Sequence, residues 1–157
     1  MRIMRIDQKD RAGINAFIVR QWYSTEMVVR GERIGLESAD GFSACEGDEI
    51  VGLITFRLQE KEMEILSLDS VCPNRGIGTA LLDKAVAAAK EAGMERVRLI
   101  TTNDNLAALR FYQKRGFDLA GLYCNAVDRA RRIKPEIPLI GNDGIPLRHE
   151  LELERRL

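Results

Sequence analysis

The stretch LSLDSVCPNRGIGTALL, residues 66–82, decides the fold because it joins a strand, a glycine turn and a helix start without interruption. Its first residues alternate apolar and polar side chains, which is typical of a strand. Apolar residues then recur at helical spacing over Thr79–Ala92, and Gly93 is placed to end that helix in a left-handed turn. Gly76 and Gly78 lie between the two elements. The pattern therefore predicts a strand that runs through a glycine turn directly into a helix.

A glycine turn in this position can bind an anion. Without a Cβ at Gly76 and Gly78 the main chain can approach a phosphate closely, and the first amides of a helix have no partner within the helix. Arg75 can add a full positive charge. The groups expected to converge on a diphosphate belong to five consecutive residues: Arg75, Gly76, Ile77, Gly78 and Thr79.

Nucleotide-binding sites fit this turn less well. The chain has no G-x-x-x-x-G-K-[ST] motif, and Leu81 occupies the third glycine position of the dinucleotide-binding pattern. Glycines also mark ordinary strand-to-helix turns, so the motif alone leaves the anion site and a plain turn open as interpretations.

The chain before this stretch begins with a strand and a helix. Met1–Ile6 alternates weakly and is expected to form a first strand. Asp7 is placed to cap an amphipathic helix that ends at about Tyr23. Ser24–Ser38 mixes glycines, charges and a Met-Val-Val cluster, which predicts a loop that could include one short helix.

An antiparallel hairpin is expected next. Gly41–Glu46 and Glu49–Leu58 flank the pair Gly47-Asp48, which suits a tight turn. Glu62–Val71 alternates as a third strand of the same meander, with Glu64, Leu66 and Leu68 expected on one face.

The remaining chain alternates strands and helices. Glu95–Thr102 is expected to be a strand, and Asn103 or Asp104 to cap the helix that follows. Phe117–Tyr123 and Ile145–Leu153 are the last expected strands, separated by a stretch with two prolines and two glycines. Antiparallel strands followed by this alternation predict a mixed sheet with helices on both faces.

Composition indicates one domain that spans residues 1–157, since 45% of the side chains are hydrophobic. The 24 basic and 24 acidic side chains cancel to a formal net charge of +0, so neither nucleic acid nor an anionic membrane is an expected partner. No apolar run approaches the roughly 20 residues of a membrane span, and the N-terminus lacks the apolar stretch of a secretion signal. A cytoplasmic protein is expected.

The cysteines and the histidine indicate neither disulfides nor a metal site. Cys45, Cys72 and Cys124 are odd in number and widely spaced, so they are expected to be reduced thiols, and no metal is expected. The only histidine, His149, is expected at a solvent-facing strand position. A serine hydrolase built around it is disfavoured because the chain has no G-x-S-x-G motif.

The glycine-turn segment resembles the GNAT superfamily of acyl-CoA-dependent N-acyltransferases, whose core motif is Q/R-x-x-G-x-G/A followed by a helix. Residues 76–82 match its glycine pair and helix start without a gap, and Leu66 and Leu68 fall at apolar positions of its fourth strand. Pro73 departs from the motif, because the family usually has Gln or Arg there and proline also lacks a backbone N–H. Arg75 is expected to compensate.

A second segment resembles the same family without a departure. It matches the signature N-x-x-A-x-x-x-Y-x-x-x-G-F, and the two matches together span Glu62–Phe117, about a third of the chain. The matching residues of the second signature are Asn105, Ala108, Tyr112, Gly116 and Phe117.

The resemblance implies an α/β (α+β) fold in a single domain. Its mixed, mostly antiparallel sheet would have about six to seven strands, helices on both faces and a splayed central pair of parallel strands, Glu62–Val71 and Glu95–Thr102. Acetyl-CoA would be the co-substrate, its pantetheine arm lying between these two strands, with Asn105 as a further contact. The backbone expected to bond to the arm belongs to three residues: Leu68, Asp69 and Ser70.

The same resemblance implies an N-acetyltransferase that acts on a primary amine. An alkyl ammonium has a pKa of about 10.4, so a base must remove a proton before attack. Glu64 is the favoured base, with Glu62 or a relay through water as alternatives. The non-catalytic interpretation is that one or both are ordinary solvated carboxylates on the strand surface. An amide near Leu68 would stabilise the oxyanion.

Tyr112 resembles the family's acid, which protonates the departing thiolate. Packing beside Phe111 in the core is the alternative interpretation of Tyr112.

The acceptor is not specified by these motifs. Residues 22–34 and 123–144 are expected to shape its pocket, with Trp22, Tyr23, Glu26 and Tyr123 as candidate contacts, although buried packing is the favoured interpretation of Trp22. The expected partners are a small-molecule or peptide amine and a second copy of the chain in a homodimer. A non-catalytic acyl-CoA-binding module is the alternative function.

Overall fold

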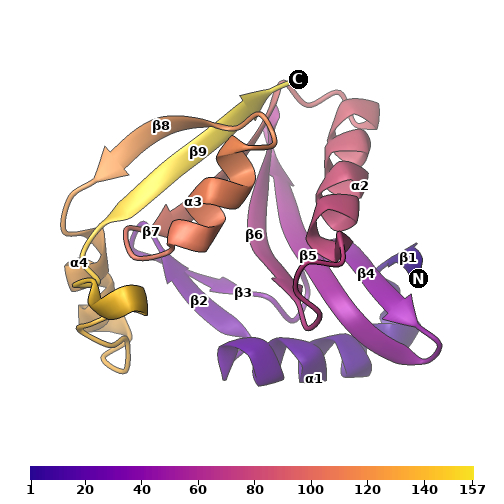
Figure 1. Ribbon diagram of the computed structural model, residues 1–157, viewed down its shortest axis with the longest axis horizontal. Helices are drawn as coiled ribbons and strands as arrows, with labels where there is room; N and C mark the ends of the chain where they lie inside the picture. The colour runs from indigo at the N-terminus through magenta and orange to yellow at the C-terminus, as the bar shows by residue number, and fades with distance from the viewer. The chain divides into compact units, whose positions relative to one another are not determined.

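The computed structural model describes residues 1–157 as two compact units (Figure 1). Unit 1 contains residues 1–27, 35–97 and 157, and unit 2 contains residues 28–34 and 98–156. The residues of the two units therefore alternate along the chain.

Unit 1 is built on antiparallel strands, as the hairpin and meander pattern predicted. Phe42 pairs with Ile54, and Ile54 pairs with Leu68 on its other side. The approach at Gly41 is so close that a Cβ there would lie 1.9 Å from the carbonyl oxygen of Ile54. In order across the sheet these strands are β1 (Arg2–Arg5), β4 (Asp40–Glu46), β5 (Glu49–Gln59) and β6 (Glu62–Ser70).

A β-bulge on β6 changes which side chains share a face. Phe56 pairs with Ile65 and Thr55 pairs with Ser67, so Leu66 is an extra residue with no partner on β5. A bulge breaks the two-residue alternation of a strand. The expected common face for Glu64, Leu66 and Leu68 is therefore wrong, because that alternation does not continue across Leu66.

Helices α1 (Arg11–Trp22) and α2 (Ile77–Glu91) both pack against β5. Six consecutive β5 residues, 51–56, are buried, which requires cover on both faces of the strand. Asp7 caps a short 3₁₀ turn, η1 (Gln8–Asp10), instead of the α-helix. Helix α2 ends just before Gly93, whose φ of 76° confirms the left-handed stop.

The loop expected over 24–38 is wrong, because the chain forms a small β-hairpin there. Strands β2 (Glu26–Val29) and β3 (Glu32–Gly35) pair as a separate two-stranded sheet. Arg30 and Gly31 form its turn with φ angles of 50° and 77°. Two positive φ angles match the right-handed twist of a hairpin, so Gly31 marked a turn rather than a loop.

Unit 2 holds the alternating half of the chain. Asn105 caps α3, its side chain accepting a hydrogen bond of 3.1 Å from the Ala108 amide, so the caps expected at Asn103 and Asp104 are wrong. The Asp104 carboxylate instead accepts from the Asn142 amide at 2.8 Å. The elements are β7 (Arg96–Thr102, entering from unit 1), α3 (Leu106–Gln113), β8 (Asp118–Tyr123), α4 (Ala126–Ile133), the 3₁₀ turn η2 (Asn142–Gly144) and β9 (Glu150–Arg156).

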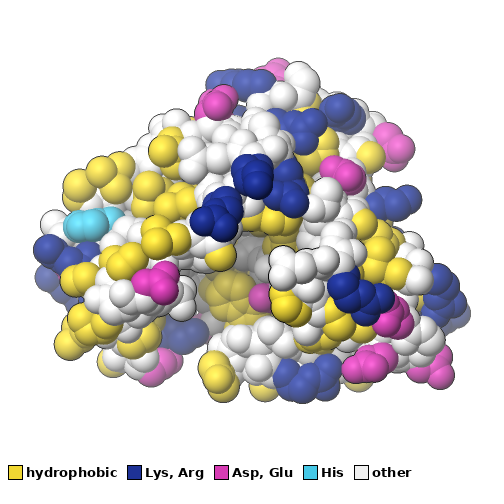
Figure 2. Space-filling view, in the orientation of Figure 1, with side chains coloured by type: hydrophobic (Ala, Val, Ile, Leu, Met, Phe, Trp, Pro, Cys, Tyr) yellow, Lys and Arg dark blue, Asp and Glu magenta, His cyan; other side chains and the backbone are white.

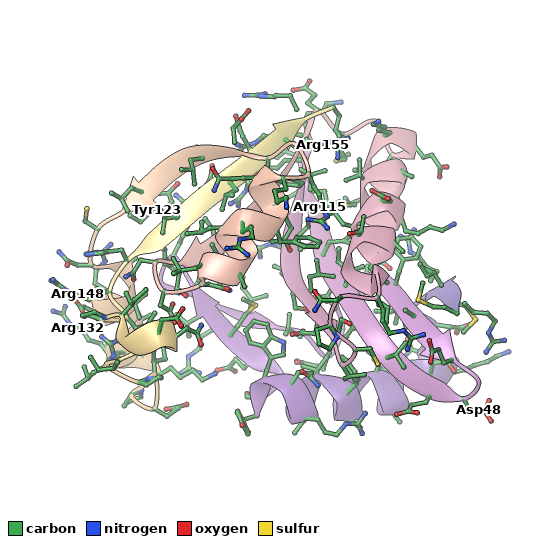
Figure 3. The ribbon with its side chains drawn as sticks, viewed as in Figure 1. Asp48, Arg115, Tyr123, Arg132, Arg148 and Arg155 are labelled. Carbon is green, nitrogen blue, oxygen red and sulfur yellow. The ribbon has the colours of Figure 1, made fainter.

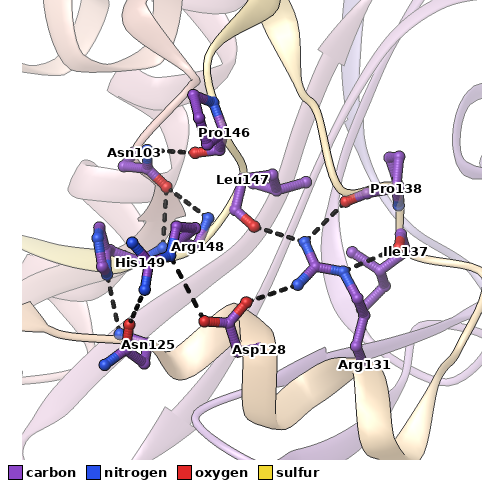
Figure 4. A network of polar contacts seen from close by, with 10 residues as sticks. All are labelled: Asn103, Asn125, Asp128, Arg131, Ile137, Pro138, Pro146, Leu147, Arg148 and His149. Atoms are coloured by element: carbon purple, nitrogen blue, oxygen red, sulfur yellow. Dashed lines mark hydrogen bonds and ion pairs between the residues drawn. The ribbon is translucent and has the colours of Figure 1, made fainter.

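Helix α4 was not predicted from the sequence, because the segment is followed closely by two prolines and two glycines. The Arg131 guanidinium of α4 holds the chain after the helix by donating to the carbonyls of Ile137 (3.0 Å), Pro138 (2.7 Å) and Leu147 (Figure 4). Asp128 accepts from Arg131 on the same helix at 2.8 Å. This side chain replaces the regular backbone pairing that the segment lacks.

His149 lies just before β9, so the strand position expected for it is wrong. Its Nδ1 accepts a hydrogen bond of 2.8 Å from the amide of Asn125, the residue that starts α4 (Figure 4). His149 therefore fixes the start of a helix.

Seven strands form one mostly antiparallel sheet in the order β1-β4-β5-β6-β7-β9-β8, which confirms the expected fold class. The three cysteines are free thiols, as expected. No helix has the length and apolar character needed to cross a membrane.

Candidate functional site

The turn between β6 and α2 has a defined backbone conformation. The Ser70 hydroxyl accepts from the Cys72 amide at 3.3 Å and donates to the Cys72 carbonyl at 3.1 Å. Asn74 and Gly76 have φ angles of 64° and 75°. Two left-handed residues reverse the chain, so that it leaves the strand and enters the helix within six residues.

Helix α2 begins without a side-chain cap. Gly76 is its N-cap residue, and a Cβ on Gly76 would have no heavy atom within 4 Å, so open space lies beside the helix start. The helix is seated closely on β5, where a Cβ on Gly52 would lie 2.6 Å from the Ile77 side chain. The N-terminus of α2 is thus packed on β5, and open space lies beside Gly76, where a helix start can bind an anion.

Arg75 lies on the surface and donates a hydrogen bond to the Glu46 carboxylate of β4. That contact lowers the pKa of Glu46 below its ordinary value. The positive charge expected at the turn is present, but an anion bound there would share Arg75 with Glu46.

The two candidate bases of β6 are each held by an arginine. Glu64 is only 3% exposed, and its Oε1 accepts from Arg57 Nε at 2.8 Å. Glu62 is half-buried and accepts from Arg96 Nε at 2.6 Å. Neither is the solvated carboxylate that the non-catalytic interpretation supposed. Arg57 faces Glu64 directly across the β5–β6 pair, so the hairpin register could have revealed this contact.

Asp69 presents a carboxyl group that the sequence analysis had used only for its backbone. The Trp22 indole donates to Asp69 Oδ2 at 2.6 Å, and burial raises the pKa of Asp69 although this bond lowers it in part. Trp22 is itself 39% exposed, so the buried packing expected for it is wrong. Nothing in the spacing of α1 and β6 along the chain signals this contact.

In unit 2, α3 carries the two remaining candidates. Tyr112 is 6% exposed, with its ring edge-on to Phe111 and Phe117 at centroid distances of 5.0 and 5.3 Å. The Tyr112 ring therefore packs in the core, and this packing is compatible with a catalytic role for the hydroxyl group. Asn105 caps the helix that carries Tyr112, so it sets where that helix begins.

The candidate residues fall into two groups. Unit 1 contains the carboxylates of β6, the end of that strand and the glycine turn, while unit 2 contains Tyr112 of α3 and the N-cap residue of that helix. In unit 1 these are Glu62, Glu64, Leu68, Asp69, Ser70, Arg75, Gly76, Ile77, Gly78 and Thr79, and in unit 2 they are Asn105 and Tyr112.

Residues 5–117 match the Acetyltransferase (GNAT) family. The chain is a GNAT acetyltransferase. This family membership makes it an acetyl-CoA-dependent enzyme, as the two motifs predicted.

The chain is also similar to a bacterial relative in sequence and to solved structures in fold. The acetyltransferase is 46% identical to the uncharacterized protein YxbD of Bacillus subtilis, over 100% of this chain and 99% of YxbD. Its fold is similar to that of an IAA acetyltransferase from Bacillus cereus, with a TM-score of 0.71 at 24% identity over 99% of each chain. A Bacillus subtilis acetyltransferase in complex with CoA has a TM-score of 0.71 at 20% identity, over 99% of this chain and 98% of its own.

The acetyltransferase also has a cavity of about 290 Å³ within unit 2. Its walls come from the β2–β3 turn, the end of β8, helix α4 and the start of β9; Figure 3 shows Tyr123 on β8. Several of these residues lie in the ranges 22–34 and 123–144 that the sequence analysis expected to shape an acceptor pocket, but Trp22 does not line it. The residues around the cavity are Arg30, Gly31, Tyr123, Ala126, Arg129, Ile133 and Glu150.

Proposed function

We propose that this acetyltransferase moves the acetyl group of acetyl-CoA to a primary amine that attacks the thioester directly. The observation that carries the proposal is the open, uncapped start of α2 at Gly76, which coincides with the family's phosphate-binding motif. The pyrophosphate of acetyl-CoA would accept from amides of residues 75–79. Arg75 supplies charge where Pro73 departs from the motif.

The end of β6 would hold the pantetheine arm. Leu68, Asp69 and Ser70 form the last three residues of β6, after the bulge at Leu66, and on one side they pair regularly with β5. An extended ligand can bond to such a strand as a further strand would. An amide near Leu68 would donate to the oxyanion.

Glu64 would act as the base for the amine, directly or through water. The carboxylate is buried, and its ion pair with Arg57 fixes its position. Glu62 is more exposed and bonded to Arg96, so it is the second candidate.

Tyr112 would donate its phenolic proton to the leaving thiolate. The contacts of its ring with Phe111 and Phe117 fix the direction of the hydroxyl.

The experiment is a screen of acetyl-CoA consumption against a panel of primary amines, with calorimetry of acetyl-CoA binding alongside. We expect micromolar to millimolar KM values for the amine that fits, with release of one free thiol per acetylated amine. Tight acetyl-CoA binding without turnover on any amine would support the non-catalytic module instead.

A cytoplasmic location and a homodimer stay predictions. Basic and acidic side chains are interspersed on the face shown in Figure 2, in keeping with the balanced total of 24 of each. This surface supports a small-molecule or peptide amine as acceptor more than a strongly charged polymer.

A further inference from the structure

The cavity of unit 2 has a chemistry that its volume of about 290 Å³ alone does not show. Two guanidinium groups, of Arg30 and Arg129, and one carboxylate, of Glu150, lie around it. Ala126 and Ile133 supply apolar wall between them. A cavity of this size fits a compound of amino-acid dimensions, near the small end of ligand pockets.

The Arg30 side chain contacts Tyr123 and Glu152 but remains partly exposed to solvent. Its guanidinium lies 4.6 Å from the centroid of the Tyr123 ring, and its Nη1 lies 3.8 Å from Glu152 Oε1. The side chain is nevertheless 47% exposed. Since the ring and the carboxylate fix its position, Arg30 can bind an anion with little further loss of side-chain freedom.

Glu152 does not pair with Arg30 alone, because Tyr123 and Arg98 also contact its carboxylate. The Tyr123 hydroxyl donates to Glu152 Oε1 at 3.1 Å, and the buried Arg98 lies 3.4 Å from the same oxygen. Arg129, exposed on α4, donates to the Cys124 carbonyl at 3.2 Å and interacts electrostatically with the Glu150 carboxyl group. Among the residues that line the cavity, two carry a guanidinium group and one a carboxyl group, so the lining is net positive.

Glu150 limits how much negative charge the cavity accepts. It is only 4% exposed and accepts from the Arg30 amide at 3.0 Å. Burial raises the pKa of Glu150, and the contacts with Arg30 and Arg129 oppose this in part. Because Glu150 lines the cavity, its carboxylate repels a second negative charge on a ligand there. A carboxylate with one charge suits the two arginines better than a phosphate or a dicarboxylate with two.

We propose that this cavity binds the carboxylate of a small monoanionic compound of amino-acid size, with Arg30 and Arg129 as the groups that hold it. The compound's role as the amine acceptor rests on the proposed function, whereas its binding does not. The guanidinium of Arg30 provides planar donors that match a carboxylate, and that of Arg129 adds charge from the helix.

The test is calorimetry of the full chain, without acetyl-CoA, against matched probes. The panel contains the common amino acids and, for each that binds, its amide and its decarboxylated amine; for leucine these are leucinamide and 3-methylbutylamine. We expect the amino acid to bind at least about 10-fold more tightly than the amide or the decarboxylated amine, because both of these lack the carboxylate. Phosphate and dicarboxylates of similar size are expected to bind more weakly.

Three variants and a control assign the effect to the cavity. Arg30→Gln keeps the backbone amide that binds Glu150, and Arg129→Gln changes an exposed helix residue, so both are expected to fold and to lose about 10-fold in affinity for the carboxylate. Arg132→Gln removes an exposed arginine of the same helix outside the cavity and is expected to change nothing (Figure 3). Glu150→Gln is expected to raise the affinity for phosphate and dicarboxylates.

The outcomes separate this proposal from the acetyl-transfer mechanism. Carboxylate binding that R30Q and R129Q weaken, in a protein that acetylates none of these compounds, supports the cavity and counts against its ligand being the acceptor. Equal binding of acid, amide and amine, or equal loss in R132Q, overturns the cavity proposal even if acetyl transfer to other amines is observed.

Discussion

The turn before α2 and the cavity beside α4 offer two different ways to bind a negative charge. In the turn the donors are main-chain amides, placed by Gly76 and a helix that has no side-chain cap. In the cavity the donors are guanidinium groups, placed by Tyr123 and Glu152. The first is made from consecutive residues, and the second from three parts of the chain, around residues 30–31, 123–133 and 150.

Different substitutions are needed to abolish anion binding at the two sites. No side-chain truncation removes a main-chain amide, so the turn is disabled when a larger side chain occupies the space in front of it or when proline removes an N–H. The cavity loses its charge when one guanidinium is replaced by a neutral amide, while its shape remains.

The largest expected effect comes from filling the turn. Gly76→Glu places a carboxylate in the open space at the start of α2, and we expect acetyl-CoA affinity measured by calorimetry to fall about 100-fold or more. The matched control is Gly93→Glu, because Gly93 has nearly the same φ, 76° against 75°, and equally open space. Both variants should lose similar stability, about 1 kcal/mol, and only the first should lose binding. Equal affinities in the two variants would show that the turn is not the phosphate site.

The next effect concerns side-chain chemistry within unit 1. Glu64→Gln is expected to lower kcat about 100-fold or more, with acetyl-CoA affinity unchanged, because a base is lost and the turn is intact. Glu62→Gln is the control, as it also removes a carboxylate bonded to an arginine, and kcat should stay within about threefold. A larger kcat loss in E62Q than in E64Q would assign the base to Glu62.

A smaller effect is expected on α3 in unit 2. Tyr112→Phe removes the hydroxyl and keeps the ring contacts with Phe111 and Phe117, so Tm should hold while kcat falls about 10-fold to 100-fold. The loss is limited because a thiol pKa near 8.5 makes the thiolate a tolerable leaving group. An unchanged kcat would leave packing as the role of Tyr112.

The smallest effect is a pH dependence of stability. Burial raises the pKa of Asp69 above its ordinary value of 3.8 in the folded protein. The protonated carboxyl group therefore stabilises the folded protein at low pH. This contribution is lost as pH rises through the pKa that Asp69 has in the folded protein. Asp69→Asn should therefore gain stability relative to the native chain as pH rises, measured by urea midpoints.

Asp40→Asn should behave in the opposite way. The hydrogen bond from Arg5 lowers the pKa of Asp40 below its ordinary value of 3.8. The carboxylate therefore stabilises the folded protein above pH 3.8. This contribution is lost as pH falls through the pKa that Asp40 has in the folded protein. Slopes of the same sign in the two variants would contradict the assigned environments.

Elements with strong local signals were predictable. The β4–β5 hairpin, β6, α2 and the strand β7 follow from alternation, helical spacing and glycine stops. The β2–β3 hairpin and α4 were not, because Arg30 adopts a left-handed turn without being a glycine, and α4 is followed by a segment that Arg131 holds from within the fold. The cap of α3 was missed by one residue.

The sequence by itself determined the GNAT family, the glycine turn and the residue types available for acid and base, because these depend on local backbone preference and short spacing. Only the tertiary structure decided that Arg57 holds Glu64, that Trp22 bonds to Asp69 and that Arg30, Arg129 and Glu150 surround one cavity. The physical reason is that a side chain's partners and solvation depend on segments brought together by folding, up to 120 residues apart in the case of Arg30 and Glu150.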